Sequence, residues 1–318
     1  MPRTILVTGG AGFIGSHLVA RLVKSNNVTV LDNLSSGRKS NLNGMKLKFT
    51  CGDIRQTRLV DRLVRQSDMV FHLAEYIPET TLYGVGHVIR YSVNKPLQDF
   101  DVGCKGTLNL LEMCRKHDKP IVFSSTAAVY GNGYINPIKE DAPTIPVSPY
   151  GASKLCAETY IALYSRLYGL QTDILRFFNV YGPKQRKYLI FDLLLKLRSD
   201  PTRLEVKGTG EERRDFIYVA DAVDSLLIVT SKRERGIICN VGTGGSYSVS
   251  QVVNLTIRSL GLKPAITYTG ASWKGDINCL VADNERLLGF GFAPKWSLKQ
   301  GIRETIRWFA EYSKTKPD

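Results

Sequence analysis

A glycine-rich turn near the start of the chain most constrains the possible fold. The segment Thr8-Gly-Gly-Ala-Gly-Phe-Ile-Gly15 follows a short β-branched run, Thr4–Thr8, and opens an amphipathic stretch. We therefore expect a buried strand, a turn and a helix in succession. Glycines at Gly9, Gly12 and Gly15 permit a tight turn, close approach of a diphosphate to the backbone, and close packing of helix on strand. Free N–H groups at the helix N-terminus favour the same anion, so the segment predicts dinucleotide binding.

Carboxylates at the ends of the next two predicted strands bear on which dinucleotide binds. Asp32 ends the second strand, 17 residues after Gly15 (32 − 15). A carboxylate there accepts hydrogen bonds from an adenosine ribose and repels a 2′-phosphate, which favours NAD over NADP. Asp53 follows the third strand, where it either hydrogen-bonds the adenine amino group or caps a helix over Arg58–Leu63.

Short apolar runs alternate with amphipathic stretches through the first half of the chain, which indicates a parallel sheet with helices on both faces. The alternation becomes less regular after Pro183, and no linker, repeat or low-complexity tract appears. The predicted fold class is α/β, a doubly wound Rossmann sheet with a smaller α/β substrate-binding lobe inserted in the C-terminal half. We expect residues 1–182 with 213–262 to form the NAD-binding domain, and residues 183–212 with 263–318 the smaller lobe.

A tyrosine and a lysine four residues apart suggest proton transfer coupled to hydride transfer. Tyr150-Gly-Ala-Ser-Lys154 begins a predicted helix, so both side chains share one face. A free tyrosine has a pKa of about 10, and a nearby ammonium together with a cationic nicotinamide favours the phenolate. Tyr150 can then accept a proton from a substrate hydroxyl while the cofactor accepts hydride. The hydroxyls of Ser124-Ser-Thr126 end the fifth strand, at the sheet edge where open α/β sheets bind ligands.

Composition excludes several other classes of protein. The first ten residues lack the charged and then apolar pattern of a secretory signal, and no run of 18 apolar residues predicts a membrane span. Six scattered cysteines without a C-x-x-C pair, and four histidines without an i, i+4 pair, indicate no metal site and a reduced, cytoplasmic protein. The 43 Lys and Arg exceed the 29 Asp and Glu by 14. This excess admits anionic ligands, but no base-reading motif accompanies it, and we expect no nucleic acid and no membrane as partners.

Together these motifs resemble the extended short-chain dehydrogenase/reductase superfamily, and within it the NAD-dependent nucleotide-sugar epimerase/dehydratase family. The resemblance is greatest to the short 4-epimerases of archaeal type that act on UDP-glucose and UDP-galactose. It covers nearly the whole chain and rests on the segments TGGAGFIGSH, VLDNLSSG, GDI, FHLA, GTLNLLE, FSSTAAVYG, SPYGASK, LRFFNVYGP, RRDFIYVADAVDSL and NVGTG.

The resemblance implies roles for individual positions. Matches to cofactor contacts are Gly9, Gly12, Phe13, Ile14, Gly15, Asp32, Asn33, Asp53, Ile54, Leu73 and Ala74, with Ser124, Tyr150 and Lys154 at the nicotinamide half. Thr126 matches the hydroxyl residue beside the sugar O4, whereas Asn179 and Arg214 match residues that bind the sugar diphosphate. The implied catalytic residues are therefore Tyr150, Lys154 and Thr126.

Two alanines distinguish this sequence from other reaction classes of the family that it resembles. Related 4,6-dehydratases carry an Asp-Glu pair after the catalytic threonine, and glucuronate decarboxylases carry a glutamate after their hydroxyl residues. Here Ala127 and Ala128 follow Thr126. Reversible oxidation at C4 needs only the tyrosine, threonine, lysine and NAD. The expected function is UDP-glucose/UDP-galactose 4-epimerisation by transient oxidation at C4, rotation of the 4-keto sugar and return of hydride.

Several positions depart from the family pattern. Glu75 stands where a second alanine is usual, and Gly103 replaces an asparagine that contacts the cofactor. Glu75 and Arg90 belong to an unusual segment that either contacts the sugar or forms a surface lid, and Arg90 would suit a carboxylated sugar. Lys207 replaces an aromatic that stacks on uracil, and Trp273 stands where an arginine grips the diphosphate, so the identity of the nucleotide stays open.

Alternative functions follow from these departures. The nearest are UDP-glucuronate and UDP-N-acetylglucosamine 4-epimerases. An alternative from another class is a non-catalytic dinucleotide-sensing or nucleic-acid-binding protein, which the net charge supports and the intact Tyr150/Lys154 pair opposes. Apolar faces over 97–116 and 150–168 predict a homodimer through a four-helix bundle, although these faces could also be core.

Overall fold

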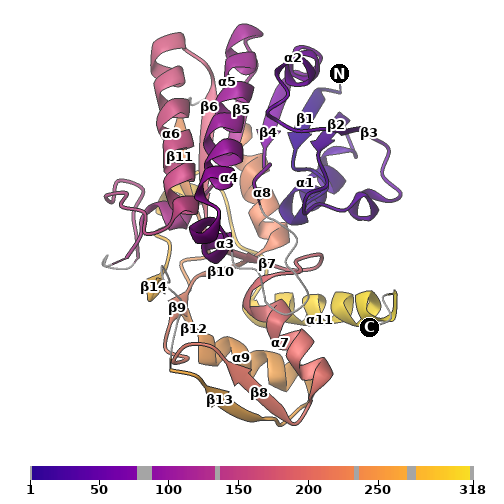
Figure 1. Cartoon of the computed structure of the whole chain (residues 1–318), viewed down its shortest axis with the longest axis vertical. Helices are drawn as coiled ribbons and strands as arrows, with labels where there is room; N and C mark the ends of the chain where they lie inside the picture. Colours follow the sequence, from indigo (N-terminus) through magenta and orange to yellow (C-terminus); the bar gives the residue numbers. More distant parts are fainter. Residues whose placement is uncertain (1, 77–87, 133–136, 233–235, 271–276, 316–318) are drawn as a thin grey trace.

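A seven-stranded parallel sheet organises the larger lobe (Figure 1). The computed structural model describes residues 2–76, 88–132, 137–232, 236–270 and 277–315, without the side chains of residues 88–90 and 315. Neighbouring strands follow the order β11-β6-β5-β4-β1-β2-β3. Their bounds are β1 Thr4–Thr8, β2 Asn27–Asp32, β3 Lys48–Cys51, β4 Met69–His72, β5 Ile121–Thr126, β6 Thr172–Phe177 and β11 Ile237–Val241. The chain reverses direction across the sheet between β1 and β4, and a crevice is expected at that point.

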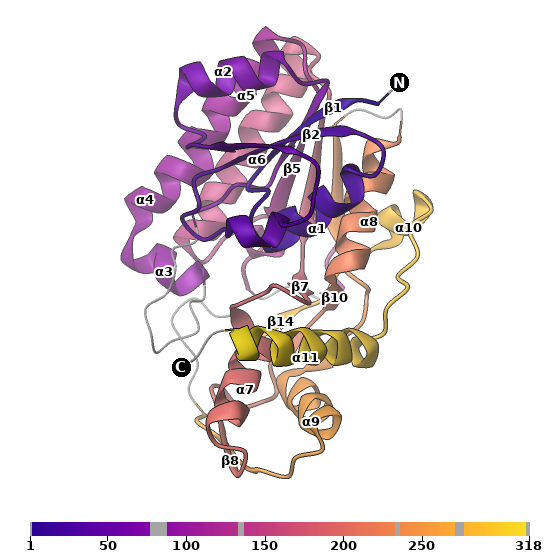
Figure 2. The same ribbon diagram turned by 90° about the vertical axis from the view of Figure 1, so that its right-hand side faces the viewer.

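Helices cover both faces of this sheet because its strands are apolar on both sides (Figure 2). In β1, Ile5 and Val7 belong to one core cluster and Leu6 to another. This alternation follows from the two-residue repeat of a strand. The helices on the first face are α1 (Phe13–Leu22) and α8 (Val219–Thr230), and those on the second are α2 (Thr57–Arg65), α5 (Thr107–Lys116) and α6 (Pro149–Tyr168). The predicted fold class is confirmed.

A chain of short elements leads from the pocket side of β4 into α5. These are α3 (Val88–Asn94), α4 (Pro96–Phe100) and the π-helical segment η2 (Asp101–Gly106). All three pack against α6. Over the ranges that the structure describes, no helix combines the length and apolarity needed to cross a membrane.

The smaller lobe lies at the opposite end of the molecule from α2 (Figure 1). It contains α7 (Tyr188–Ser199), α9 (Val249–Leu260) and the parallel strands β8 (Arg203–Val206) and β13 (Ala265–Tyr268). Helix α11 (Leu298–Thr315) packs against α7 and α9. Small sheets lie between the lobes, made of β7 (Asn179–Tyr181) with β10 (Phe216–Tyr218), and of β12 (Tyr247–Ser248), β9 (Arg213–Arg214) and β14 (Cys279–Leu280).

The packing differs from the predicted domain division at two helices. The prediction placed α9 in the larger domain, but Val253 and Ile257 of α9 share a core cluster with Leu193 of α7. It placed α10 (Glu285–Gly289) in the smaller lobe, but Leu287 packs into the core beneath the large sheet. The chain therefore crosses between the two lobes at more points than the predicted division has. We therefore propose that the boundary follows this packing.

Candidate active site

The glycine turn forms a cradle that only glycine fits. Gly9 has φ +71°, and a Cβ there would lie 2.6 Å from the backbone nitrogen of Ala74. A Cβ on Gly15 would lie 2.2 Å from the carbonyl oxygen of Gly9, so α1 begins almost against the turn. The turn is closed by the N–H of Gly12, which donates to the Gly9 carbonyl at 3.1 Å. This close approach of backbone to cavity is what a diphosphate requires, and the residues present fit a dinucleotide.

Asp32 lies at the end of β2 with its carboxylate fixed by backbone groups. One oxygen accepts the N–H of Ala11 at 2.9 Å and the other the N–H of Leu34 at 2.8 Å. Burial raises the pKa of Asp32 above its ordinary value, and these two hydrogen bonds oppose that shift. A Cβ on Gly37 would lie 2.9 Å from both oxygens, so the facing loop can approach only as glycine. The carboxylate is thus rigidly presented to the cavity.

Asp53 does not cap a helix. Helix α2 begins at Thr57 and its N-cap residue is Gln56, so the capping alternative was wrong. Instead the carboxylate of Asp53 accepts two hydrogen bonds from the Arg55 guanidinium at 2.8 Å and one from Asn33 at 3.0 Å. Hydrogen bonding to Arg55 is the main reason why the pKa of Asp53 falls to about 2. Its contact with adenine stays a prediction.

One cavity of about 730 Å³ collects most of the predicted site residues from both lobes. Those that line it are Gly9, Gly12, Phe13, Ile14, Gly15, Asp32, Asn33, Asp53, Ile54, Leu73, Ala74, Glu75, Ser124, Thr126, Tyr150, Lys154, Asn179 and Arg214. The volume is in the upper range of ligand pockets. Arg90 lies within α3, but its side chain falls outside the described residues, as does all of Trp273.

The proposed acid–base residues meet at one end of the cavity, where α6 faces the end of β5. Helix α6 starts after Ser148, whose hydroxyl accepts the N–H of Gly151 and so fixes the first turn. Thr126 lines the cavity with Tyr150 and lowers the pKa of its phenol. Lys154 donates to the carbonyl oxygen of Ser124 at 2.9 Å. The spacing of four thus places both α6 side chains over the strand that carries the hydroxyls, as the sequence predicts.

Glu75 supplies a charge that the tyrosine–lysine motif does not contain. Its carboxylate lies 2.7 Å from the ammonium of Lys154, and the two side chains are 5% and 3% exposed. Burial, and then the negative charge of Glu75, raise the pKa of Tyr150 well above its ordinary value, whereas the Thr126 hydrogen bond lowers it. The prediction that Lys154 and a cationic nicotinamide together favour the phenolate of Tyr150 did not include this counter-ion of Lys154.

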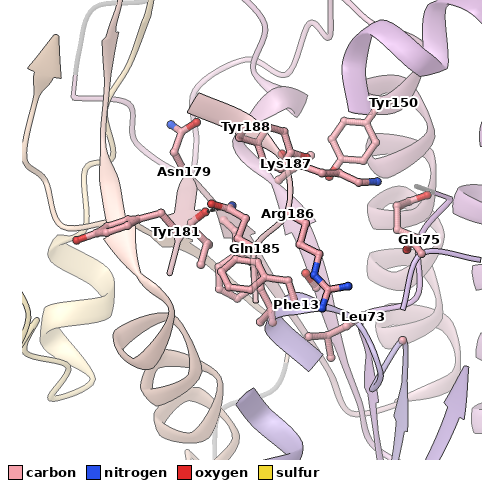
Figure 3. A pocket seen from close by; sticks show the side chains of 18 of the residues that line it. Phe13, Leu73, Glu75, Tyr150, Asn179, Tyr181, Gln185, Arg186, Lys187 and Tyr188 are labelled. Atoms are coloured by element: carbon pink, nitrogen blue, oxygen red, sulfur yellow. Dashed lines mark hydrogen bonds between the residues drawn. The ribbon is translucent and has the colours of Figure 1, made fainter. Parts of the chain in front are cut away.

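Sequence reasoning missed two further residues near Tyr150. Tyr188 opens α7 with φ +69°, a conformation that residues other than glycine rarely adopt and that is often found at functional sites. Figure 3 shows it in the same pocket as Tyr150 and Glu75. Asp99 in α4 is 1% exposed and accepts the Ser153 hydroxyl at 2.6 Å. Neither belongs to a local motif, so only the folded chain reveals them.

Asn179 and Arg214 lie on β7 and β9, which line the cavity between the lobes. The side-chain amide of Asn179 donates to the carbonyl of Asp215 at 3.3 Å. The carboxylate of Asp215 in turn accepts the N–H groups of Thr243 and Gly244, both at 2.9 Å. The guanidinium of Arg214 donates to the carbonyl of Arg213 at 2.9 Å. Both predicted diphosphate ligands are therefore held by backbone groups at the cavity wall.

Comparison with known proteins agrees with this geometry. A Methanocaldococcus jannaschii protein that carries the provisional name UDP-glucose 4-epimerase is 36% identical, over 98% of this chain and 100% of its own length. The structure of UDP-glucose 4-epimerase with UDP-glucose from Thermotoga maritima is 32% identical, with TM-score 0.88 over 97% of this chain and 99% of that one. The Thermus thermophilus UDP-glucose 4-epimerase in complex with NAD is 33% identical, with TM-score 0.84 over 96% and 99%. Residues 5–242 match the NAD dependent epimerase/dehydratase family, so the chain belongs to this family of NAD-dependent enzymes.

Proposed function

We propose that this enzyme is a 4-epimerase that interconverts UDP-glucose and UDP-galactose. The observation that carries the proposal is the composition of the catalytic end of the cavity. Tyr150 and Thr126 line this end of the cavity, where Thr126 lowers the pKa of Tyr150. The two positions after Thr126 are the alanines Ala127 and Ala128, which are 1% and 5% exposed. This set can move a proton at one sugar hydroxyl but offers no carboxylate at positions 127 and 128 for chemistry at C5 or C6.

In the proposed mechanism, NAD supplies the hydride acceptor and donor when it is bound. Tyr150 removes the proton from the sugar O4 and later returns it, and the Thr126 hydroxyl in the same cavity shares that proton. Lys154 is held by Ser124 and Glu75, so its ammonium stays fixed on the same face of α6 as Tyr150. Asn179 and Arg214 hold the sugar diphosphate, because an amide and a guanidinium donate to phosphate oxygens. Because only the diphosphate is held in this way, the 4-keto sugar could rotate about this tether and present its other face to the cofactor.

The test is a substrate panel with purified enzyme. We expect UDP-glucose and UDP-galactose to interconvert, and Tyr150→Phe to lower kcat by about 10²–10⁴ because the acid–base group is lost. The matched control is Tyr160→Phe on the same helix, whose side chain is exposed and which should retain activity. Turnover of only UDP-glucuronate or UDP-N-acetylglucosamine would replace the substrate assignment. No turnover of any pair, with salt-sensitive binding of nucleic acid that Tyr150→Phe leaves unchanged, would favour the non-catalytic alternative.

We further propose a homodimer in which the helices over 97–116 and 150–168 pair with their counterparts in a second copy as a four-helix bundle. Large apolar side chains are exposed on these helices, among them Leu97 at 79% and Leu167 at 63%. Such a concentration is expected at a protein interface. The double substitution Leu97→Glu with Leu167→Glu should give monomers in analytical ultracentrifugation. Leu288→Glu changes an exposed side chain of α10, and this control should leave the assembly unchanged. A wild-type monomer would refute the proposal.

We also propose a reducing, cytoplasmic location. The support is that all six cysteines are unpaired, including Cys51 at the surface. Fractionation of the source cells with an antibody against the chain tests this, and recovery from an oxidising compartment would contradict it.

A further inference from the structure

The ion pair between Glu75 and Lys154 is built into the catalytic end of the cavity. Besides its 2.7 Å contact with Lys154, Glu75 accepts the N–H of Tyr76 at 2.8 Å, so its carboxylate is held from two sides. Lys154 also lies 4.6 Å from the centre of the Phe123 ring. Since both charges are almost fully buried, neither can be removed without leaving the other uncompensated.

Gly103 makes room for this carboxylate. It lies in the π-helical segment η2, and a Cβ there would lie 3.1 Å from one oxygen of Glu75 and 3.2 Å from the Cβ of Ser153. An asparagine, the residue usual at this position by resemblance, would need the space that Glu75 fills. The two departures from the family pattern are therefore in contact, and each accommodates the other.

Groups on several elements surround Tyr150. Asp99 on α4 and Tyr188 on α7 both raise its pKa, whereas the cations Arg186 and Lys187 line the same cavity. Burial raises the pKa of Asp99 to about 6, and Glu75 adds to this shift. Because Lys154 is balanced by Glu75, the positive charge that favours a tyrosinate must come from Arg186, Lys187 or the bound cofactor. The oxidised nicotinamide is a cation, whereas the reduced one is neutral.

We propose that Glu75 is a positioning residue that neutralises Lys154, so that Tyr150 loses its proton more readily when the oxidised cofactor lies beside it. The same buried carboxylate favours the cationic, oxidised form of NAD over NADH, because opposite charges attract strongly where water is excluded. Glu75 thereby couples the state of the acid–base residue to the state of the cofactor. This inference rests on the proposed role of Tyr150 as the acid–base group.

The primary test measures binding, and it does not depend on turnover. Apo-protein is titrated with NAD+ and with NADH by calorimetry. For Glu75→Gln we expect the ratio of the Kd for NADH to the Kd for NAD+ to fall at least fivefold. Asp61→Asn removes an exposed carboxylate that is paired with Lys116 and serves as the control with an unchanged ratio. An unchanged ratio in a folded Glu75→Gln protein would overturn the proposal, even if the enzyme acts on a different sugar.

The second measurement is the pH dependence of kcat. Removing the negative charge of Glu75 leaves Lys154 unopposed, which favours the phenolate, so the acidic midpoint should move down by about one pH unit in Glu75→Gln. A merely structural role would lower kcat without moving this midpoint. If the wild type turns over no sugar, the proposed function fails while the binding ratio still decides the role of Glu75.

A double-mutant cycle tests the contact with Gly103 and provides a second variant if Glu75→Gln does not fold. Gly103→Asn alone should lower the melting temperature and weaken NAD+ binding, because it displaces the carboxylate. In the Glu75→Ala background the same change should be tolerated, giving strong non-additivity. The double variant should show the same fall in the Kd ratio. Additive effects, or a wild-type ratio in the double variant, would contradict the matched pair.

Discussion

Replacing Gly15 by alanine is the sharpest test of the dinucleotide cradle. The added Cβ would lie 2.2 Å from the carbonyl oxygen of Gly9, whereas ordinary contacts begin at 3.4 Å, so the atoms overlap by about 1.2 Å (3.4 − 2.2). The Cα of Gly10 would lie 2.9 Å away on the same side. Both obstacles are backbone, so α1 must move away from the turn. Overpacking of this kind costs about 1–3 kcal/mol.

The displacement separates the turn from the N-terminus of α1, where the diphosphate must bind. We expect the affinity for NAD to fall at least tenfold in calorimetry, since about 1.4 kcal/mol corresponds to a factor of ten. Gly289→Ala is the matched control, because no atom lies within 4 Å of its added Cβ. A Gly15→Ala protein that binds NAD as tightly as the Gly289→Ala protein would refute the assignment of this turn to the cofactor.

Two predictions concern buried charge. Glu158→Gln leaves the guanidinium of Arg176, which is 2.7 Å from Glu158 and 5% exposed, without its counter-charge. We expect a loss of about 3–5 kcal/mol in urea unfolding, against less than about 1 kcal/mol for Glu304→Gln in a surface pair. A loss as small as that of the surface pair would contradict the buried role. Burial raises the pKa of Asp173 to about 7, so the folded chain binds a proton that the unfolded chain releases near pH 4. The resulting stability is present below about pH 4 and is lost as the pH rises through 7. Asp173→Asn should therefore be more stable than the wild type at pH 8, and unfolding curves at pH 5 and 8 that keep the same difference would exclude this linkage.

The elements that the sequence predicts most accurately are those with local causes. The strand Thr4–Thr8 has the predicted bounds, because buried parallel strands are short, continuous apolar runs. Helix α9 likewise begins at a local signal, because Ser248 caps it and forms a full capping box with Gln251. These signals are contained within a few neighbouring residues, so no knowledge of distant contacts is needed.

The shortest strands and the boundaries between the lobes could not be predicted from the sequence. Strand β9 has two residues, and it exists because β12 and β14 flank it. Strands this short carry no periodicity, since the two-residue repeat needs several residues to appear. The positions of α9 and α10 likewise depend on which core their apolar faces contact. An amphipathic pattern shows that a helix has an apolar face, but it does not show which core that face packs against.

At the catalytic end of the cavity, too, some features follow from local sequence and others only from tertiary contacts. The glycine spacing, the carboxylate after β2 and the tyrosine–lysine pair on one helical face follow from the geometry of turns, strands and helices, and the linear sequence is enough to predict them. The charge around Tyr150 does not follow in this way. Parallel pairing of β4 with β5 brings Glu75 beside Lys154, and the π-helical segment brings Gly103 against both. Electrostatic interactions depend on distance in space and on burial, so the tertiary structure alone decides how acidic the tyrosine is.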